Sequence, residues 1–327
     1  SGDSGDFFKT TDGGDTWEPI PELIHSQNGC FAVYAAAHPA TAGVIYAGVG
    51  SCAGIPLVPG EGGVFYSDDY GQTWITRTHG LTDTDVIDLA FDPADPDQLL
   101  LATMSGNIFA TTDGGQNWSW QAKIDDGLRR IYFSPHIAGQ YWAIPLHPRF
   151  GGSEPQHSLY RSTDVTAWDG VDLPSGAAEV WNLSFEPGGI WAAAHFGFFS
   201  DDGGDTWSEV MANQPSSGGL ADFVVDAGDP NVIYAGAQER AFFKSIDGGA
   251  SWNVSNTGLA ALNPRDVVAS NVEPDTVYAN IDGFELIRSY NGGSTWQGLG
   301  VRNGGGGQSG RFLALDPFTP LRVYYEQ

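Results

Sequence analysis

Short apolar runs alternate with polar turns along the whole chain. A recurring unit begins with an apolar run, a turn containing Asp or Pro, and a second apolar run, as in "VIDLAFDPADPDQLLLAT" and "RDVVASNVEPDTVYANI". A loop, a third run and an acidic turn follow. β-Branched and aromatic residues beside Asp-Pro turns are typical of strands. Each unit therefore predicts strand a, turn, strand b, loop, strand c, acidic turn and strand d.

The acidic turn has a fixed spelling: Ser/Thr, any, Asp, any, Gly, any, any, Trp. Intact copies occupy residues 10–17, 67–74, 111–118, 200–207 and 245–252. Two altered copies are "SYNGGSTW", with Asn291 in the Asp position, and "STDVTAW", which keeps Asp164 and Trp168 but lacks the glycine and one residue. Successive tryptophans of these boxes lie 39 to 57 residues apart, the length of a four-stranded propeller blade.

Each box residue has a role in folding. An Asp in a turn can accept hydrogen bonds from nearby backbone N–H groups, and glycine adopts the left-handed conformation without steric cost. The Trp brings a large apolar surface to the packing between neighbouring sheets. We therefore expect the box carboxylates to form the turns between strands c and d, and not an active site used several times. These residues are Asp12, Asp69, Asp113, Asp164, Asp202 and Asp247.

The two ends of the chain complete each other. The chain begins with a strand c and its box, and ends with strands a and b at Arg311 to Gln327. We therefore predict an all-β, seven-bladed β-propeller in which residues 1–327 form one domain. The N- and C-terminal strands share one blade and close the ring, which removes open sheet edges. The incomplete first unit is also compatible with a segment of a longer protein that carries further domains.

The box is identified as the Asp-box (BNR) repeat, and the chain resembles Asp-box β-propellers over essentially its whole length. That group includes sialidases, xyloglucan-degrading glycoside hydrolases, the sortilin family and a photosystem II assembly factor. The resemblance implies a propeller with its boxes at the blade periphery, away from the ligand. "GRFLALDP" and "FFKTTDGGDTW" resemble the phrasing of the xyloglucan-degrading enzymes. The catalytic signatures of these enzymes and of sialidases have no clear match, so the sequence leaves open whether the chain is an enzyme.

Charge limits the partners. The chain has 40 acidic and 14 basic residues and a formal net charge of -26. Such a field repels phosphate backbones and anionic lipids, which disfavours nucleic acid and membrane surfaces. No run approaches the roughly 20 apolar residues that insert into a bilayer. The composition favours a secreted, extracellular or periplasmic protein. No spacing matches a metal or cofactor signature, although acidic turns can attract Ca²⁺.

The two cysteines, Cys30 and Cys52, lie at equal distances from a predicted hairpin turn near Thr41. Partners in register across a hairpin can form a disulfide, and an exported protein would favour one. The alternative is a pair of buried thiols.

In a propeller, the face formed by the b–c and d–a loops is usually the binding face, and we call it the top face. Two b–c loops are long, "CAGIPLVPGEGG" and the loop from Pro145 to Ser158. Long loops on one face tend to build sites. The predicted ligand-binding residues are Arg129, His147, Arg149, Glu154, His157, His195, Arg240, Asp282 and Arg311.

Three arginines, Arg129, Arg265 and Arg311, lie near the starts of a-strands and could hold a carboxylate or sulfate. The alternative is that they neutralise acidic neighbours on the rim. Those neighbours are Asp126, Asp222 and Asp266.

Two functions are consistent with these features. The first is an exported recognition scaffold that binds a glycan or a protein segment on the top face. The alternative is a carbohydrate-active enzyme, a glycoside hydrolase or polysaccharide lyase, with its site on the same face. Convergence of His147, His157, Arg129 and Arg149 on one pocket would favour chemistry, and a scattered arrangement would favour binding.

Overall fold

The structure is a computed structural model. It describes residues 7–20, 31–51, 62–124, 127–146, 156–174, 179–186, 188–211, 219–226, 228–237, 241–259, 263–270, 273–281, 285–300, 313–319 and 321–326. Every element in these ranges is a β-strand, and the strands form seven antiparallel sheets of four. The fold is thus a seven-bladed β-propeller, as the repeat predicts. The described residues contain no helix able to cross a bilayer.

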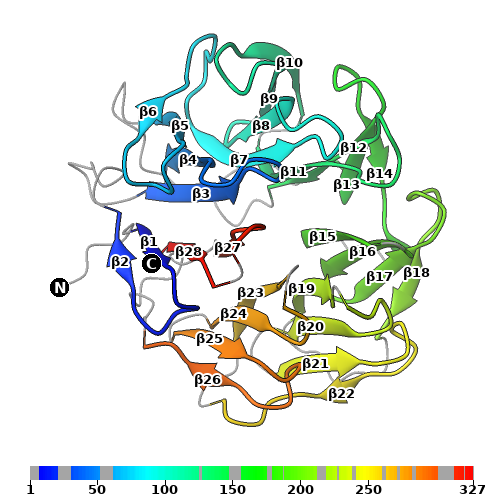
Figure 1. Cartoon of the computed structure of the whole chain (residues 1–327). Coiled ribbons are helices and arrows are strands. Elements are labelled where there is room, and N and C mark those ends of the chain that lie inside the picture. Colours follow the sequence, from blue (N-terminus) through cyan, green and yellow to red (C-terminus); the bar gives the residue numbers. More distant parts are fainter. Residues whose placement is uncertain are drawn as a thin grey trace. The chain divides into compact units, whose positions relative to one another are not determined.

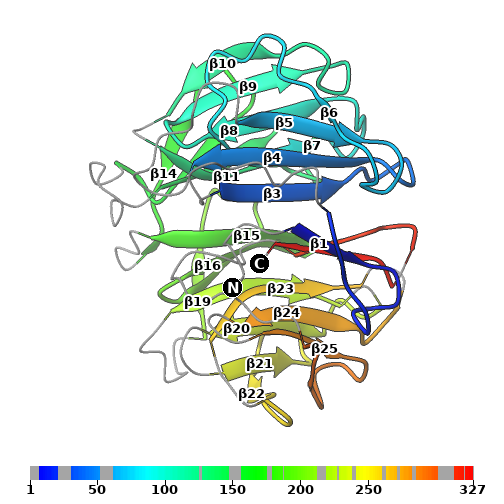
Figure 2. The same ribbon diagram turned by 90° about the vertical axis from the view of Figure 1, so that its left-hand side faces the viewer.

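The chain divides into two compact units. Unit 1 comprises Ser1–Phe7 and Pro19–Asp172, and unit 2 comprises Phe8–Glu18 and Leu173–Gln327. Figure 1 shows that, within each unit, blades that follow one another in the sequence are neighbours. In the turned view, β3, β4 and β5 of unit 1 run side by side, and so do β23, β24 and β25 of unit 2 (Figure 2).

Unit 1 holds three complete blades, each with its strands in sequence order. Blade 2 contains β3 (Phe31–Ala37), β4 (Ile45–Ser51), β5 (Gly63–Ser67) and β6 (Ile75–Thr76). Blade 3 contains β7 (Val86–Phe91), β8 (Leu99–Thr103), β9 (Asn107–Thr111) and β10 (Ser119–Lys123). Blade 4 contains β11 (Leu128–Phe133), β12 (Tyr141–Pro145), β13 (Leu159–Ser162) and β14 (Asp169–Val171).

Unit 2 also holds three blades of this kind. Blade 5 contains β15 (Val180–Glu186), β16 (Gly189–Ala194), β17 (Gly197–Ser200) and β18 (Ser208–Val210). Blade 6 contains β19 (Leu220–Val225), β20 (Ile233–Ala237), β21 (Ala241–Ser245) and β22 (Asn253–Val254). Blade 7 contains β23 (Pro264–Ala269), β24 (Val277–Ile281), β25 (Leu286–Ser289) and β26 (Gln297–Gly298).

Blade 1 is assembled from both ends of the chain. Its strand order is β2 (Glu18–Pro19), β1 (Phe7–Thr10), β28 (Val323–Glu326) and β27 (Leu313–Leu315). Figure 1 shows the blue and red strands of this sheet together. The shared blade predicted from the sequence is therefore present.

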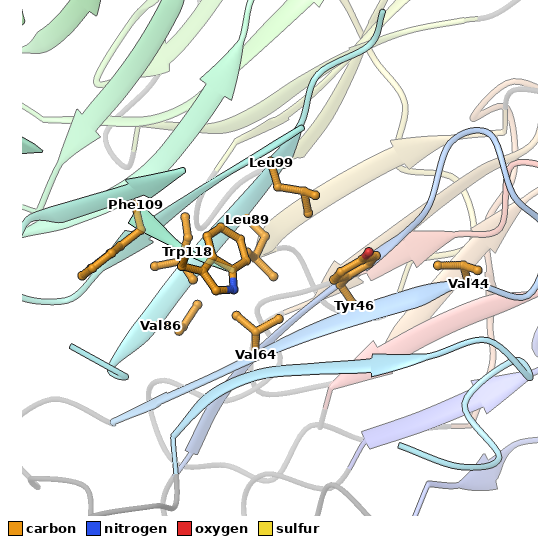
Figure 3. Packing of buried hydrophobic residues seen from close by; sticks show 9 residues of the cluster. Val44, Tyr46, Val64, Val86, Leu89, Leu99, Phe109 and Trp118 are labelled. Atoms are coloured by element: carbon orange, nitrogen blue, oxygen red, sulfur yellow. The ribbon is translucent and has the colours of Figure 1, made fainter. Parts of the chain in front are cut away.

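Apolar side chains of neighbouring blades interlock to form the core. Between blades 2 and 3, the indole of Trp118 lies among Val64, Val86 and Leu89 (Figure 3). Trp118 is 5% exposed. Burying a large aromatic side chain is worth about 1.5–3 kcal/mol, so each such tryptophan stabilises the packing of one blade on the next.

Two box tryptophans also bond to the preceding blade. Trp118 donates its indole N–H to Arg77 O (2.9 Å) and its backbone N–H to His79 O (2.9 Å). Trp296 repeats both bonds with Ser255 O (2.8 Å) and Thr257 O (3.0 Å). The residue following each of these backbone acceptors is a glycine, in "HGL" and "TGL" respectively.

Gly80, in "HGL", permits this close approach. Its φ is 90°, and a Cβ there would lie 2.1 Å from Trp118 O. A larger residue would therefore push blade 3 away from blade 2.

The box turns are tied to their own blade and to the blade before it. The N–H groups of Gly13 and Gly292 donate to the a–b turns of their blades, at Leu321 O (2.7 Å) and Asp275 O (2.8 Å). The carbonyl groups of the same two glycines accept from cations of the preceding blade, which are Arg288 for Gly13 and Lys244 for Gly292. Each of these two boxes thus links two blades.

We expect Gly80→Ala to lower the free energy of unfolding by about 2 kcal/mol more than Gly139→Ala does. Gly139 also has a positive φ, 71°, but a Cβ there would have no neighbour within 4 Å. Both variants carry the backbone strain, and only Gly80→Ala adds overpacking, which typically costs about 1–3 kcal/mol. Urea denaturation followed by tryptophan fluorescence measures both. Equal losses would contradict the proposed contact.

Candidate functional site

The box carboxylates are satisfied within their own turns. Asp12 accepts from the N–H of Thr16 (2.9 Å) and the hydroxyl of Thr10 (2.7 Å). Equivalent bonds from Asn117 lower the pKa of Asp113 to about 2, and bonds from Thr206 lower the pKa of Asp202 to about 2. Groups held as carboxylates by side-chain and backbone hydrogen bonds of their own turn are poor general acids or bases at neutral pH.

The altered boxes keep the same turn by other means. Asn291 accepts from the N–H of Thr295 (2.8 Å) and donates its amide to the Thr295 hydroxyl (2.8 Å). In the shortened box, Asp164 accepts from the N–H groups of Thr166 and Ala167, both at 2.9 Å. Val165 there has a φ of 60°, the conformation that glycine adopts elsewhere. The turn geometry is therefore retained in both boxes, although one lacks the carboxylate and the other lacks the glycine.

A β-bulge recurs in the innermost strand of five blades. The register shifts between Val86 and Asp88 in β7, and at the corresponding point of β11, β15, β19 and β23. Bulges re-aim side chains next to functional sites. The residue that follows each bulge is polar: Asp88, Arg130, Asn182, Asp222 and Asp266.

In unit 1, the polar residues after the bulge join blade 3 to blade 4. Asp88 is 2% exposed and accepts from the N–H of Ile131 (2.8 Å). Its other oxygen lies 3.6 Å from Arg130 Nη1. Burial raises the pKa of Asp88 to about 6, and the Arg130 guanidinium opposes this shift. Arg130, adjacent to the predicted Arg129, is therefore the arginine that neutralises an acid here.

In unit 2, Asp222 has the same role and is 3% exposed. It accepts from the N–H of Val267 in blade 7 (3.2 Å) and from the side-chain amide of Asn182 in blade 5. Burial, together with the nearby Asp266, raises its pKa well above the ordinary value. Asp222 is therefore not an exposed acid of the rim. It is buried instead, because the bulge turns it toward the backbone of the next blade.

Two of the predicted binding residues lie at opposite edges of blade 4. Arg129 is in the bulge of β11, the innermost strand. His157 precedes β13 and lies against the outermost strand, β14. Its ring is within 2.3 Å of the position that a Cβ of Gly170 would take, and its Nδ1 is 3.2 Å from Asp172 Oδ1. Adjacent strands are about 4.8 Å apart, so three spacings, or about 14 Å, separate β11 from β14.

The third described candidate, His195, is exposed in the b–c turn of blade 5. It lies beside Trp181, with ring centroids 6.3 Å apart, and beside Phe196 at 6.2 Å. The remaining predicted binding residues lie outside the described residues: His147, Arg149, Glu154, Arg240, Asp282 and Arg311.

The register of β3 and β4 runs from Phe31 opposite Ser51 to Ala37 opposite Ile45, which centres the hairpin at residue 41 as predicted. Cys30 and Cys52 themselves lie outside the described residues, so the disulfide stays a prediction. Within the described ranges, no group of three or more His, Cys, Asp or Glu side chains could hold a metal ion.

We expect Asp88→Asn to change the pH dependence of stability. Because folding raises the pKa of Asp88 from 3.8 to about 6, the folded chain binds this proton more tightly than the unfolded chain. Wild-type stability is therefore lost as pH rises across that window. The side-chain amide of the variant would accept the same backbone bond without ionising, so the variant should gain up to about 3 kcal/mol relative to wild type between pH 4 and 7. Parallel curves of unfolding free energy against pH would contradict this.

Comparison with known proteins agrees with the fold. A BNR/Asp-box repeat model matches residues 198–209. The photosystem II assembly lipoprotein Ycf48 of Nostoc sp. is 30% identical over 156 residues, which is 46% of this chain and 43% of that protein. The chain thus aligns with less than half the length of this relative.

Two solved structures share the fold. A GH74 xyloglucanase from Xanthomonas campestris has a TM-score of 0.70 at 16% identity, over 95% of this chain and 54% of that one. YCF48 bound to D1 peptide has a TM-score of 0.55 at 18% identity, over 90% of this chain and 96% of that one. The chain therefore carries a BNR/Asp-box repeat, matched at residues 198–209, within a seven-bladed β-propeller.

Proposed function

We propose that the chain is a recognition scaffold that binds an extended protein segment on its top face. The observation that carries this proposal is the sequence similarity to Ycf48, 30% over 156 residues. A related Ycf48 has been solved with a bound D1 peptide. The curated relatives from Nostoc and Trichormus are named lipoproteins, which supports an exported location for this chain as well.

Aromatic groups on the top face of unit 2 suit such a ligand. His195 is exposed and Phe196 is half-buried in the turn between β16 and β17, and the buried Trp181 of the innermost strand supports the His195 ring. Rings with an apolar body and a polar edge contact peptides at low entropic cost.

One carboxylate on the top face of unit 1, that of Asp83, favours a cationic segment. Asp83 accepts from the side chains of Ser105 and Asn107 in the b–c turn of blade 3. Burial opposes ionisation of Asp83, but these hydrogen bonds lower its pKa. With a net charge of -26 on the chain, a basic partner would be steered toward the protein.

Placement of the candidate catalytic groups favours binding over chemistry. The enzyme hypothesis combines Arg129 with His157, and these residues lie at opposite edges of blade 4. A general base must be within hydrogen-bonding reach of the atom it deprotonates. A glycan ligand or a glycosidase activity remains an outcome of the test below.

The test compares short fluorescein-labelled peptides, one rich in Lys and Leu, one with Glu in place of Lys and one neutral, with xyloglucan oligosaccharides. We expect the cationic peptide to bind the full chain in fluorescence polarisation, more weakly as salt is raised. The double variant His195→Ala, Phe196→Ala should weaken binding about tenfold.

The matched control is Ile246→Ser in unit 2. Ile246 is 66% exposed in a box turn, at the other end of its blade from the b–c loops, and this variant should bind as wild type does. Equal weakening by both variants would contradict the placement on the top face. Release of reducing ends from xyloglucan without peptide binding would replace the scaffold by the enzyme.

A further inference from the structure

A pocket of about 180 Å³ lies in unit 1 where blade 2 meets blade 3. It is at the end of the blades that carries the box turns and the a–b turns, which we call the box side. The a–b turns of both blades and the box of blade 3 form its walls. A cavity of about 150 Å³ can hold benzene, so this pocket has room for a molecule of amino-acid size. Its principal lining residues are His38, Val44, Tyr66, Arg77, Asp97 and Gln116.

Arg77 brings a positive charge to this pocket. Its guanidinium carbon lies 3.4 Å from the centre of the Tyr66 ring. Its Nη1 donates to the hydroxyl of Tyr46 (3.0 Å) and to Gly114 O in the box of blade 3. Arg77 therefore holds the next box by the same glycine carbonyl that Arg288 and Lys244 hold in unit 2.

Arg288 reaches the matching glycine carbonyl from β25, a strand c, whereas Arg77 follows β6, a strand d, and Arg288 has a counter-ion in the box that it holds. Arg288 Nη2 pairs with Asp15 at 3.1 Å, from the box that Arg288 holds. The residue at the Asp15 position in the blade 3 box is Gln116. Among the described residues, no carboxylate oxygen lies within 4.0 Å of the Arg77 nitrogens. The Arg77 guanidinium therefore has hydrogen-bonding capacity for a carboxylate in the pocket.

A negative charge lies close by. Asp97 Oδ1 and Arg77 Nη1 are 3.4 Å and 3.1 Å from the position that a Cβ of Gly114 would take, yet the two side chains form no ion pair. Both line the pocket. His38, which is 7% exposed, accepts from the N–H of Ala40 at Nδ1 (3.2 Å), which leaves the Nε2 proton as a donor.

We propose that this pocket binds a free α-amino acid, with the ligand carboxylate on Arg77, its ammonium group on Asp97, and its side chain against Val44 and Tyr66. The two protein charges are separate but near each other, as are the two charges of the ligand. A net-neutral zwitterion also avoids the repulsion that a protein of net charge -26 exerts on a simple anion.

The experiment titrates the full chain, labelled with ¹⁵N, with leucine, N-acetylleucine and leucinamide. The reporter is the indole N–H of Trp118, which donates to Arg77 O at 2.9 Å, with its signal assigned by Trp118→Phe. We expect leucine to shift this signal saturably. The two compounds that lack one charge should bind at least about tenfold more weakly, because each loses one charge-assisted contact.

Two variants test the residues without breaking the contact of Arg77 with Gly114. Gln116→Asp supplies the internal partner that Asp15 gives Arg288, and Asp97→Asn removes the negative charge. Each should weaken leucine binding about tenfold with an unchanged urea midpoint. The control Asp95→Asn alters an exposed residue of the same turn that is not part of the pocket lining, and should bind leucine as wild type does.

Absence of a saturable shift with leucine would overturn the proposal. Equal affinities for leucine and N-acetylleucine would overturn the role of Asp97, and full binding by Gln116→Asp would overturn that of Arg77.

Discussion

The fold depends on the box turn and on the hydrogen bonds that converge on its backbone. The side chain of the Asp or Asn holds the turn. In the boxes of blades 1, 3 and 7, the N–H of the following glycine ties the turn to the a–b turn of the same blade, and its carbonyl accepts from a cation of the preceding blade. Tryptophans such as Trp118 then fill the space between the blades. Conformational entropy opposes the ordering of many short strands, and these repeated ties offset part of that cost.

A second set of ties lies on the innermost strands. A bulge presents a backbone N–H to the preceding blade, where a buried Asp88 or Asp222 accepts it. Asp88 and Asp222 are buried within the sheets, and the box carboxylates accept hydrogen bonds within their own turns. Both sets of acidic side chains therefore contribute to folding. The b–c connections of the top face differ in length and sequence between blades. These connections can therefore form a surface specific for one ligand.

The sequence predicts the fold well because the fold repeats. Box spacing predicts the number of blades, and the incomplete units at the two ends predict the shared blade, since both are local patterns with a fixed period. The sites are less predictable. Arg129 and Arg130 are adjacent in sequence, and only the bulge decides that Arg130 faces Asp88. Asp222 resembles a surface acid until blades 5 and 7 are placed on either side of it. The role of Arg77 depends on Gly114 in the next blade, 37 residues away. The sequence does show that Gln116 replaces the acid found at the Asp15 position, but not that Arg77 lies beside it.

The box turns hold the fold together, and we propose that the top face recognises a protein segment. Hydrogen–deuterium exchange of the full chain, with and without the Lys- and Leu-rich peptide, tests this proposal most directly. We expect new protection in the top-face turns around 103–107 and 194–197, and we expect box turns such as 113–117 and 202–206 to exchange equally slowly in both states. Protection confined to the box turns, or no change on adding peptide, would contradict the proposal.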